Sequence, residues 1–192
     1  GVKNAYLLAD MSYRTYENPE TALKTARILL QNGADGIKLE GMHEEIISHI
    51  TGHNIEVWAH LGYNPQFHDS ASVQGKTLDA AKALVDDSIR LQNAGAKMIV
   101  FELIPEELGK AITEKLQIPT IGIGAGRYTD GQVLIVQDML GITPRSMRHA
   151  KEYVDLKTII SDAFKEYIKE VTDGQFPQEG NVRKMKEDTL IC

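Results

Sequence analysis

The chain has 192 residues, of which 42% are hydrophobic, and this is enough for a substantial core in one domain. Its formal net charge of -6 and its pI near 5.5 argue against a nucleic-acid-binding surface, which needs a basic face. No apolar run approaches the roughly 20 residues of a membrane-spanning helix, so no membrane partner is expected. The only cysteine is the terminal Cys192, so we expect no internal disulfide and a cytoplasmic location.

The first part of the chain alternates apolar strands with amphipathic helices. Residues 4–10 form an apolar run that ends at Asp10 and is typical of a buried strand. Asn18 and Pro19 then predict the start of a helix, and Gly33 predicts its end. The next predicted elements are a strand at 36–41, a short helix at 43–52 and a strand at 55–62.

The alternation continues after a polar stretch at 63–76 that has no periodicity. A loop of this length inside a compact domain is usually functional or disordered. The later predicted elements are a helix at 77–95, a strand at 97–104, a helix at 105–116, a strand at 118–126 and a helix at 155–174. Between them, residues 132–141 predict a sixth strand, although so short an apolar run also suits a helical turn.

One segment occurs twice, as "NGADGIKLEG" and again as "NAGAKMIVFEL". In each copy a glutamate follows the glycine of Gly-Ala by seven residues, from Gly33 to Glu40 and from Gly95 to Glu102. The echo indicates a repeated helix–strand unit, and two-sided apolar strands indicate a parallel sheet. The expected fold class is therefore α/β, a (β/α)₈ TIM barrel.

Only six strands are predicted, whereas a closed barrel of this class has eight. We favour the interpretation that the first two barrel strands are absent from this chain, and an open sheet is the alternative. Residues 1–192 are then expected to form a single barrel domain.

Chemically useful side chains fall at the predicted C-terminal ends of strands, where barrel enzymes carry their active sites. Asp10, Glu40, His60 and Glu102 should therefore converge on one mouth. A buried, unpaired carboxylate is unfavourable, so simple pairing of each acid with a lysine is the alternative to a functional role. Acids grouped beside the cation of Lys38 suit a hard divalent ion such as Mg²⁺.

Lys38 lies two residues before Glu40, so the two side chains share one face of the strand. Lys38 is either a charge partner for Glu40 or a cation aimed at a substrate carboxylate or a developing enolate. His60 is either a hydrogen-bonded strand-end histidine or a member of the site. These residues indicate a metal-assisted enzyme that acts on a small anionic, carbonyl-containing substrate.

Eight motifs resemble, in order, those of the ketopantoate hydroxymethyltransferase (3-methyl-2-oxobutanoate hydroxymethyltransferase) family. They are "LLADM", "GADGIKLEG", "AHLGYNPQ", "VQGKT", "NAGAKMIVFELIP", "IPTIGIGAG", "TDGQVLIVQDMLG" and "DGQFPQE". The resemblance implies a barrel of the phosphoenolpyruvate/pyruvate type, with strands equivalent to 3–8 of the family barrel followed by a C-terminal helix and tail. It also implies a homo-oligomer, commonly a decamer.

The reaction implied by the resemblance belongs to pantothenate biosynthesis. A hydroxymethyl unit passes from 5,10-methylenetetrahydrofolate to α-ketoisovalerate and gives ketopantoate through a Mg²⁺-stabilised enolate. By the same resemblance, Asp10 binds Mg²⁺ and substrate, and Glu40 belongs to the metal site. Lys38 contacts the keto acid, His60 lines the pocket, and Glu102 is the general base.

The chain departs from the family pattern at several positions. Ser12 and Tyr13 stand where the family usually has proline and phenylalanine, and Gln137 stands where a histidine is usual. "FHDSAS" replaces paired glycines before "VQGKT". In the family, a Gly-Asp-Ser segment that supplies a metal ligand and a substrate-binding serine precedes the matched region.

Two other interpretations stay open. One is a Mg²⁺-dependent C–C lyase or mutase of the same barrel superfamily, which would not use folate. No cysteine-bearing catalytic loop of the lyase kind is found, since Cys192 is terminal. The other is a non-catalytic remnant.

Overall fold

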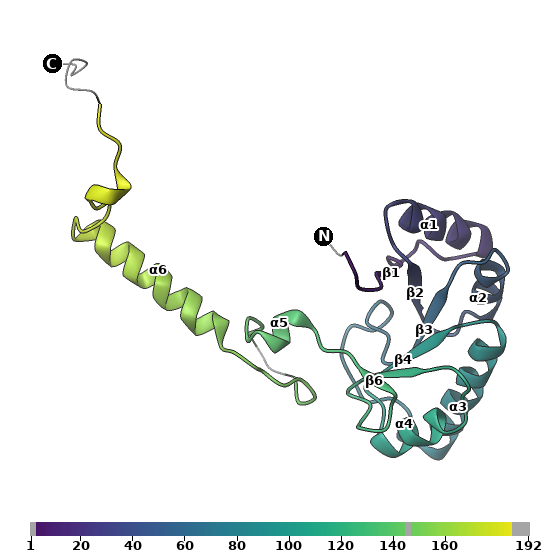
Figure 1. Ribbon diagram of the computed structural model, residues 1–192. Helices are drawn as coiled ribbons and strands as arrows, with labels where there is room; N and C mark the ends of the chain where they lie inside the picture. The colour runs from purple at the N-terminus through teal and green to yellow at the C-terminus, as the bar shows by residue number, and fades with distance from the viewer. Residues whose placement is uncertain (1–2, 145–146, 186–192) are drawn as a thin grey trace. The chain divides into compact units, whose positions relative to one another are not determined.

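The computed structural model describes residues 3–144 and 147–185, which fall into two compact units divided after Val133 (Figure 1). Cys192 lies outside the described residues. The first unit contains β1 (Leu8–Asp10), α1 (Pro19–Gln31), β2 (Gly36–Glu40), α2 (Glu44–Thr51), β3 (Val57–Gly62), α3 (Leu78–Asn93), β4 (Met98–Glu102), α4 (Glu106–Thr113), β5 (Thr120–Ile123) and β6 (Gly131–Gln132). The second contains α5 (Val136–Met139), α6 (Leu156–Thr172) and the 3₁₀ turn η1 (Glu179–Asn181).

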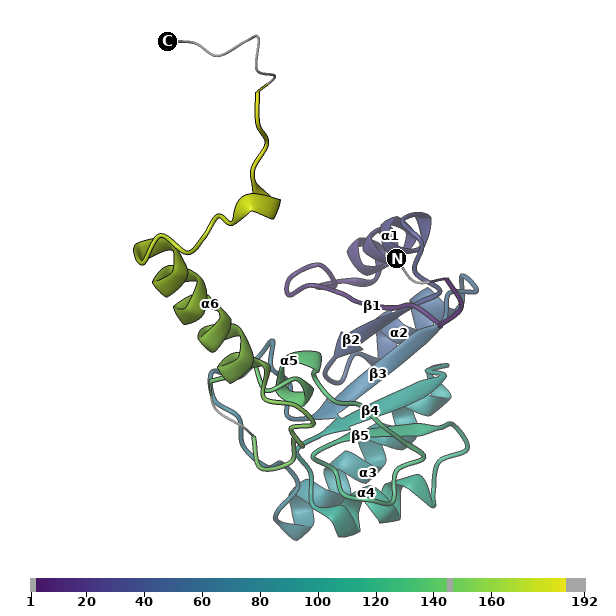
Figure 2. The ribbon, with the colours of Figure 1, turned by 60° about the vertical axis from the view of Figure 1, so that its left-hand side comes forward.

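The six strands of the first unit form one curled sheet in the order β1 to β6, and every neighbouring pair is parallel. Helices α1 to α4 run along its outer side (Figures 1 and 2). The predicted α/β class with a parallel sheet is confirmed. Among the described residues the sheet is a half-barrel, and it does not close into eight strands.

The core of this unit lies between the sheet and its helices. Alternate residues of the central strands are fully buried there and pack on the helices. Those from the strands are Ile37, Leu39, Val57, Ala59, Ile99 and Phe101, and those from the helices include Ala22, Ala26, Ile47, Ile50 and Leu91. The intervening strand residues face the opposite, concave side, and these include Lys38, Glu40, His60 and Glu102.

The repeated Gly-Ala segment forms the same turn twice. Gly33 and Gly95 follow α1 and α3 with φ angles of +100° and +103°, a conformation that glycine adopts without steric penalty. The next residue in each copy donates its N–H back into the helix, from Ala34 to Leu29 at 3.2 Å and from Ala96 to Leu91 at 3.1 Å. The predicted helix–strand repeat is therefore confirmed in geometry.

The helix caps predicted from the sequence are also present. The Asn18 side chain accepts from the N–H of Thr21 at 2.9 Å, and the Thr77 hydroxyl accepts from Ala80 at 3.3 Å. Each bond satisfies an N–H group that the first turn of the helix cannot pair internally.

The strand predicted at 132–141 is largely wrong. Sheet pairing ends after Gln132, with one further bond from the N–H of Val133 to Gly122, and a helical turn follows at α5. The apolar side chains that suggested a strand are about half exposed, and they include Val133, Ile135 and Val136. The apolar run at 133–136 has only four residues and fits both the two-residue period of a strand and the 3.6-residue period of a helix. For this reason the helical alternative stayed open in the sequence. The first strand is also shorter than predicted, since β1 begins at Leu8.

The second unit is dominated by α6, whose first turn is capped by the Asp155 carboxylate accepting from Thr158 at 3.0 Å. No residue of α6 is buried. One face carries large apolar side chains that are 44–64% exposed, namely Ile160, Phe164, Tyr167, Ile168 and Val171. In the described part of the chain, no helix combines the length and the apolar character needed to cross a membrane.

Candidate active site

Five strand-end side chains meet on the concave side of the sheet. The parallel register sets Asp10 beside Lys38, Glu40 beside His60 and Gly62 beside Glu102. The polar groups then link across the strands. The Lys38 ammonium lies 3.0 Å from the Asp10 carboxylate and 3.4 Å from Nδ1 of His60, and Nε2 of His60 lies 3.4 Å from the Glu102 carboxylate. The structure thus brings together every residue that the sequence nominated.

His60 is the central member of this cluster and is almost fully buried. Its Nε2 lies 2.9 Å from the Tyr63 carbonyl oxygen, so this nitrogen carries the hydrogen, while Nδ1 accepts from Lys38. Burial, together with the charge of Lys38, lowers the pKa of His60 to about 4. His60 is therefore neutral near pH 7, and its approach to Glu102 is a long neutral contact and not an ion pair.

Glu40 is buried, with a side chain that accepts a hydrogen bond from the backbone N–H of Gln66 at 2.9 Å. Burial raises its pKa, and the Asp10 carboxylate adds to this effect. The Gln66 N–H and the Lys38 charge oppose it. Glu40 is thus a carboxylate whose charge is only partly compensated by the described residues.

Glu102 has the environment expected of a base that works near neutral pH. Its side chain is 14% exposed, and burial followed by repulsion from Glu40 raises its pKa to about 7. Lys38 acts in the opposite direction. At pH 7 the group is thus poised between accepting and releasing a proton.

Sequence reasoning missed two residues that hold this site in place. Gln66, in the loop after β3, donates its side-chain N–H to the Met11 carbonyl at 2.9 Å, and its backbone N–H binds Glu40. Tyr16 is buried and donates its hydroxyl to the Gln66 side chain at 2.6 Å. The available signal was the position of Gln66 in "AHLGYNPQ", directly after a strand that carries His60.

The oxygen ligands in the cluster suit a hard cation, although they are few. Among the described residues, no group of three or more His, Cys, Asp or Glu side chains could hold a metal ion. The available oxygens are those of Asp10, which is half exposed, and of buried Glu40, and the Asp10 carboxylate raises the pKa of Glu40. Mg²⁺ commonly binds through one or two carboxylates with water and substrate oxygens, so Asp10 and Glu40 fit it.

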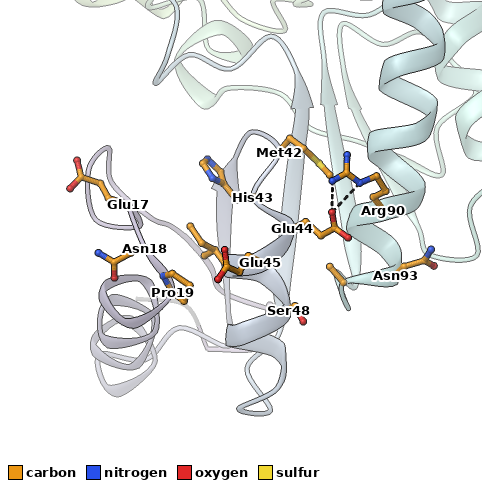
Figure 3. Close-up of a pocket in the computed structure, with 12 residues that line it drawn as sticks. Glu17, Asn18, Pro19, Met42, His43, Glu44, Glu45, Ser48, Arg90 and Asn93 are labelled. Atoms are coloured by element: carbon orange, nitrogen blue, oxygen red, sulfur yellow. Dashed lines mark hydrogen bonds and ion pairs between the residues drawn. The ribbon is translucent and has the colours of Figure 1, made fainter.

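A groove of about 850 Å³ in the first unit lies elsewhere (Figure 3). It runs over the start of α2 and is crossed by an ion pair in which Arg90 donates to Glu44 at 2.9 Å. None of the five cluster residues lines it. Its size alone therefore does not locate the chemistry.

Comparisons with known proteins agree with the motif order. Residues 1–179 match the family described as ketopantoate hydroxymethyltransferase. A protein named 3-methyl-2-oxobutanoate hydroxymethyltransferase from Thermosipho melanesiensis is 41% identical over 191 residues, covering 96% of this chain and 72% of that protein. A protein of the same name from Marinomonas sp. is 44% identical, covering 92% of this chain and 66% of that protein.

A solved structure from Burkholderia cenocepacia J2315, provisionally assigned as a phosphonomutase, is similar in fold. The TM-score is 0.50 at 16% identity, with 62% of this chain and 56% of that chain covered. At this identity the likeness shows the fold alone.

Proposed function

The chain belongs to the ketopantoate hydroxymethyltransferase family, and from this we propose that it transfers a hydroxymethyl group to 3-methyl-2-oxobutanoate, giving ketopantoate for pantothenate biosynthesis. The proposed one-carbon donor is 5,10-methylenetetrahydrofolate. The observation that supports this most directly is the presence at one end of the sheet of a base whose pKa is raised to about 7, Glu102, and a cation, Lys38, on either side of His60.

The first chemical step is removal of the C3 proton of the keto acid. Glu102 accepts this proton because its raised pKa lets the carboxylate hold it near neutral pH. The electrons left at C3 delocalise into the carbonyl group and give an enolate. Lys38 stabilises that developing negative charge from β2, which is separated from the strand of Glu102 by β3. The nucleophilic C3 then forms the new carbon–carbon bond to the methylene carbon of the donor. Over the whole transfer both carbon–nitrogen bonds of that methylene group break, water supplies the hydroxyl group, and tetrahydrofolate leaves with the C3 proton and the second proton of the water on its two nitrogens.

His60 acts as a positioning residue in this scheme. Its neutral ring lies between Lys38 and Glu102 and keeps the cation and the base apart. If they paired directly, the ion pair would lower the pKa of Glu102 and weaken it as a base. The Tyr63 carbonyl fixes the tautomer that makes this arrangement possible.

Asp10 and Glu40 would hold Mg²⁺ in the proposal. When bound, this ion supplies Lewis-acid polarisation of the keto-acid oxygens and so acidifies C3. Asp10 also pairs with Lys38 and therefore orients that ammonium group toward the same side of the site.

The proposal extends to the state of the complete protein. The curl and parallel order of the sheet support a (β/α)₈ barrel of the phosphoenolpyruvate/pyruvate type. The exposed apolar face of α6 supports a homo-oligomer, a decamer by family resemblance. A cytoplasmic enzyme that uses the keto acid and folate is proposed.

Exchange of the C3 proton tests the proposal without requiring folate. Proton NMR of α-ketoisovalerate in D₂O should show Mg²⁺-dependent loss of the C3 signal with the protein present. Glu102→Gln should reduce the exchange rate by about 100-fold or more, because it removes the general base. Glu107→Gln, an exposed glutamate five residues further along, is the matched control and should exchange normally.

Product analysis with 5,10-methylenetetrahydrofolate then tests the transfer itself. Ketopantoate should form only when this donor is present. Exchange without ketopantoate would instead favour another enolising reaction of the same fold, and no exchange by a folded sample would contradict the proposal.

A further inference from the structure

A second, smaller pocket lies at the same edge of the sheet as the five-residue cluster. It has a volume of about 280 Å³ and is lined by Tyr13, Arg14, Tyr16, Glu17, His43 and Phe67, and we call these residues the aromatic pocket. Three segments supply them, namely the loop after β1, the start of α2 and the loop after β3. Each segment follows the C-terminal end of a strand, which is where the catalytic cluster also lies.

The walls of the aromatic pocket are rings that meet edge to face. Tyr13 and Phe67 have centroids 5.5 Å apart at an interplanar angle of 82°, and Tyr16 and His43 have centroids 5.4 Å apart at 83°. Phe67 also lies 6.1 Å from His43. Tyr13 and Phe67 remain 52% and 46% exposed, so their ring surfaces are available to a ligand. Such walls suit a flat aromatic ring.

One residue of the pocket is connected to the catalytic cluster by hydrogen bonds. Buried Tyr16 donates its hydroxyl to Gln66, whose backbone N–H binds the Glu40 carboxylate. Gly41 follows Glu40 with a φ of +95°, and a Cβ placed there would come within 3.2 Å of the His43 ring. A ligand in the pocket would therefore lie one hydrogen-bonded residue away from Glu40.

The pocket also carries one charge of each sign. The Arg14 guanidinium lies 5.3 Å from the centre of the Tyr13 ring, at the distance of a cation–π contact. Neither Arg14 nor Glu17 has an ion-pair partner among residues 3–144 and 147–185. A matching ligand would present hydrogen-bond donors to Glu17 and an oxygen acceptor to Arg14.

We propose that the aromatic pocket receives the reduced pteridine ring of the one-carbon donor. This inference rests on the proposed function, which requires such a donor beside the keto acid. The pteridine edge offers a ring N–H and an amino group that match the Glu17 carboxylate, and its ring carbonyl oxygen is an acceptor that matches the Arg14 guanidinium. The volume suits one bicyclic ring, and the adjoining groove, which shares Glu17 and His43, leaves room for the rest of the donor (Figure 3).

The keto acid is not the occupant of this pocket. It has no ring to stack, and its carboxylate and keto oxygens are matched by Lys38 and by the Mg²⁺ that Asp10 and Glu40 would hold. The departure of this chain from its family at Tyr13 and in the loop that contains Phe67 therefore falls on the donor side of the site.

Equilibrium binding of tetrahydrofolate to the full chain, measured by calorimetry, tests the assignment. Phe67→Ala and Tyr13→Ala should each weaken binding about tenfold, because each removes one stacking wall. Phe67→Leu keeps the apolar volume but loses the ring, and it should weaken binding as well. Tyr128→Ala removes an aromatic ring of matched exposure, 47%, outside the pocket and should bind as the unaltered protein does.

Two further measurements separate the possible failures. Tetrahydropterin should compete with tetrahydrofolate, whereas p-aminobenzoylglutamate should not, because the pocket recognises the ring. In each variant the loss of tetrahydrofolate affinity should exceed any change in C3-proton exchange at least fivefold. Normal tetrahydrofolate binding by the Phe67 and Tyr13 variants, in a protein that exchanges the C3 proton, would overturn the pocket assignment alone. Absence of both exchange and tetrahydrofolate binding in the unaltered protein would overturn the proposed function together with it.

Discussion

At the scale of single residues, the cluster places a base and a cation close together, although the two groups need different electrostatic surroundings. Glu102 needs a low-dielectric surrounding to be basic enough, whereas an enolate needs a cation nearby. Lys38 satisfies the second need, and neutral His60 separates it from Glu102. The pKa values follow from this arrangement, since burial is the first cause of the shifts in both Glu102 and His60.

The raised pKa of Glu102 predicts the pH profile of proton exchange. Only the deprotonated carboxylate can accept the C3 proton, so the exchange rate should rise with pH and level off above a midpoint near 7. NMR exchange rates of α-ketoisovalerate between pH 5 and 9 would measure it. A midpoint near 4.5, the ordinary value for glutamate, would show that burial does not control this group.

The same shift predicts a pH dependence of stability. Folded Glu102 binds its proton more tightly than the unfolded chain does, so this group adds stability below pH 4.5. That contribution is lost as the pH rises from 4.5 through about 7. Urea unfolding without Mg²⁺ should therefore show a smaller fall in unfolding free energy over this range for Glu102→Gln. Parallel curves for the two proteins would contradict the expectation.

Removal of the Lys38 charge should raise the pKa of Glu102. Lys38 lowers the pKa of Glu102, so Lys38→Met should move the midpoint of the exchange profile to higher pH, in addition to slowing exchange. The shift in midpoint distinguishes an electrostatic role from simple loss of keto-acid binding. An unchanged midpoint would mean that Lys38 does not act on the base.

At the scale of elements, the close approach of β3 and β4 depends on one glycine. Gly62 ends β3 with a φ of +93°, and a Cβ there would overlap the backbone carbonyl oxygen of Glu102 and lie 2.9 Å from Ile104. Glycine is needed at this position for two reasons, its positive φ and the absence of space.

Substitution of that glycine should affect both stability and the base. Gly62→Ala should lower the unfolding free energy by more than the ~1–2 kcal/mol of left-handed strain and should slow exchange by displacing Glu102. Gly33→Ala is the matched control, since Gly33 has a φ of +100° with open space around it. Denaturant unfolding would compare them, and equal losses would show that overlap with Glu102 is unimportant.

Most elements could be predicted because their signals are local. Asn18 and Thr77 cap helices within three residues of themselves, and Gly33 and Gly95 end helices through turns only a few residues long. The strand-end positions of Lys38 and His60 followed from the parallel sheet. Gln66 could not be found this way, since its bonds to Glu40 and Met11 join residues 26 and 55 positions apart.

At the scale of the whole molecule, α6 has an apolar face that no other described element of its own unit covers. Its apolar face, from Ile160 to Val171, contributes nothing to a core among the described residues of its own unit. The sequence predicted the helix and the face, but no pattern within a helix identifies what covers it. An exposed apolar face of this extent is typical of an assembly surface.

The proposed oligomer can be tested at this face. Phe164→Glu combined with Ile168→Glu should lower the mass measured by light scattering after size exclusion, because two charges would have to be buried at the interface. Glu166→Lys, on the opposite side of the helix, should leave the mass unchanged. An unaltered oligomer with the double substitution would exclude α6 from the interface.

The alternation along the strands has a consequence for how this protein can change over evolution. In β2, Ile37 and Leu39 serve the core, while Lys38 and Glu40 serve the site. Neighbouring positions in the strand are therefore under different selection, one for stability of the fold and the next for the reaction. A lineage could exchange its reaction by altering the inward positions and keep an intact core, which makes a half-barrel of this design easy to reuse.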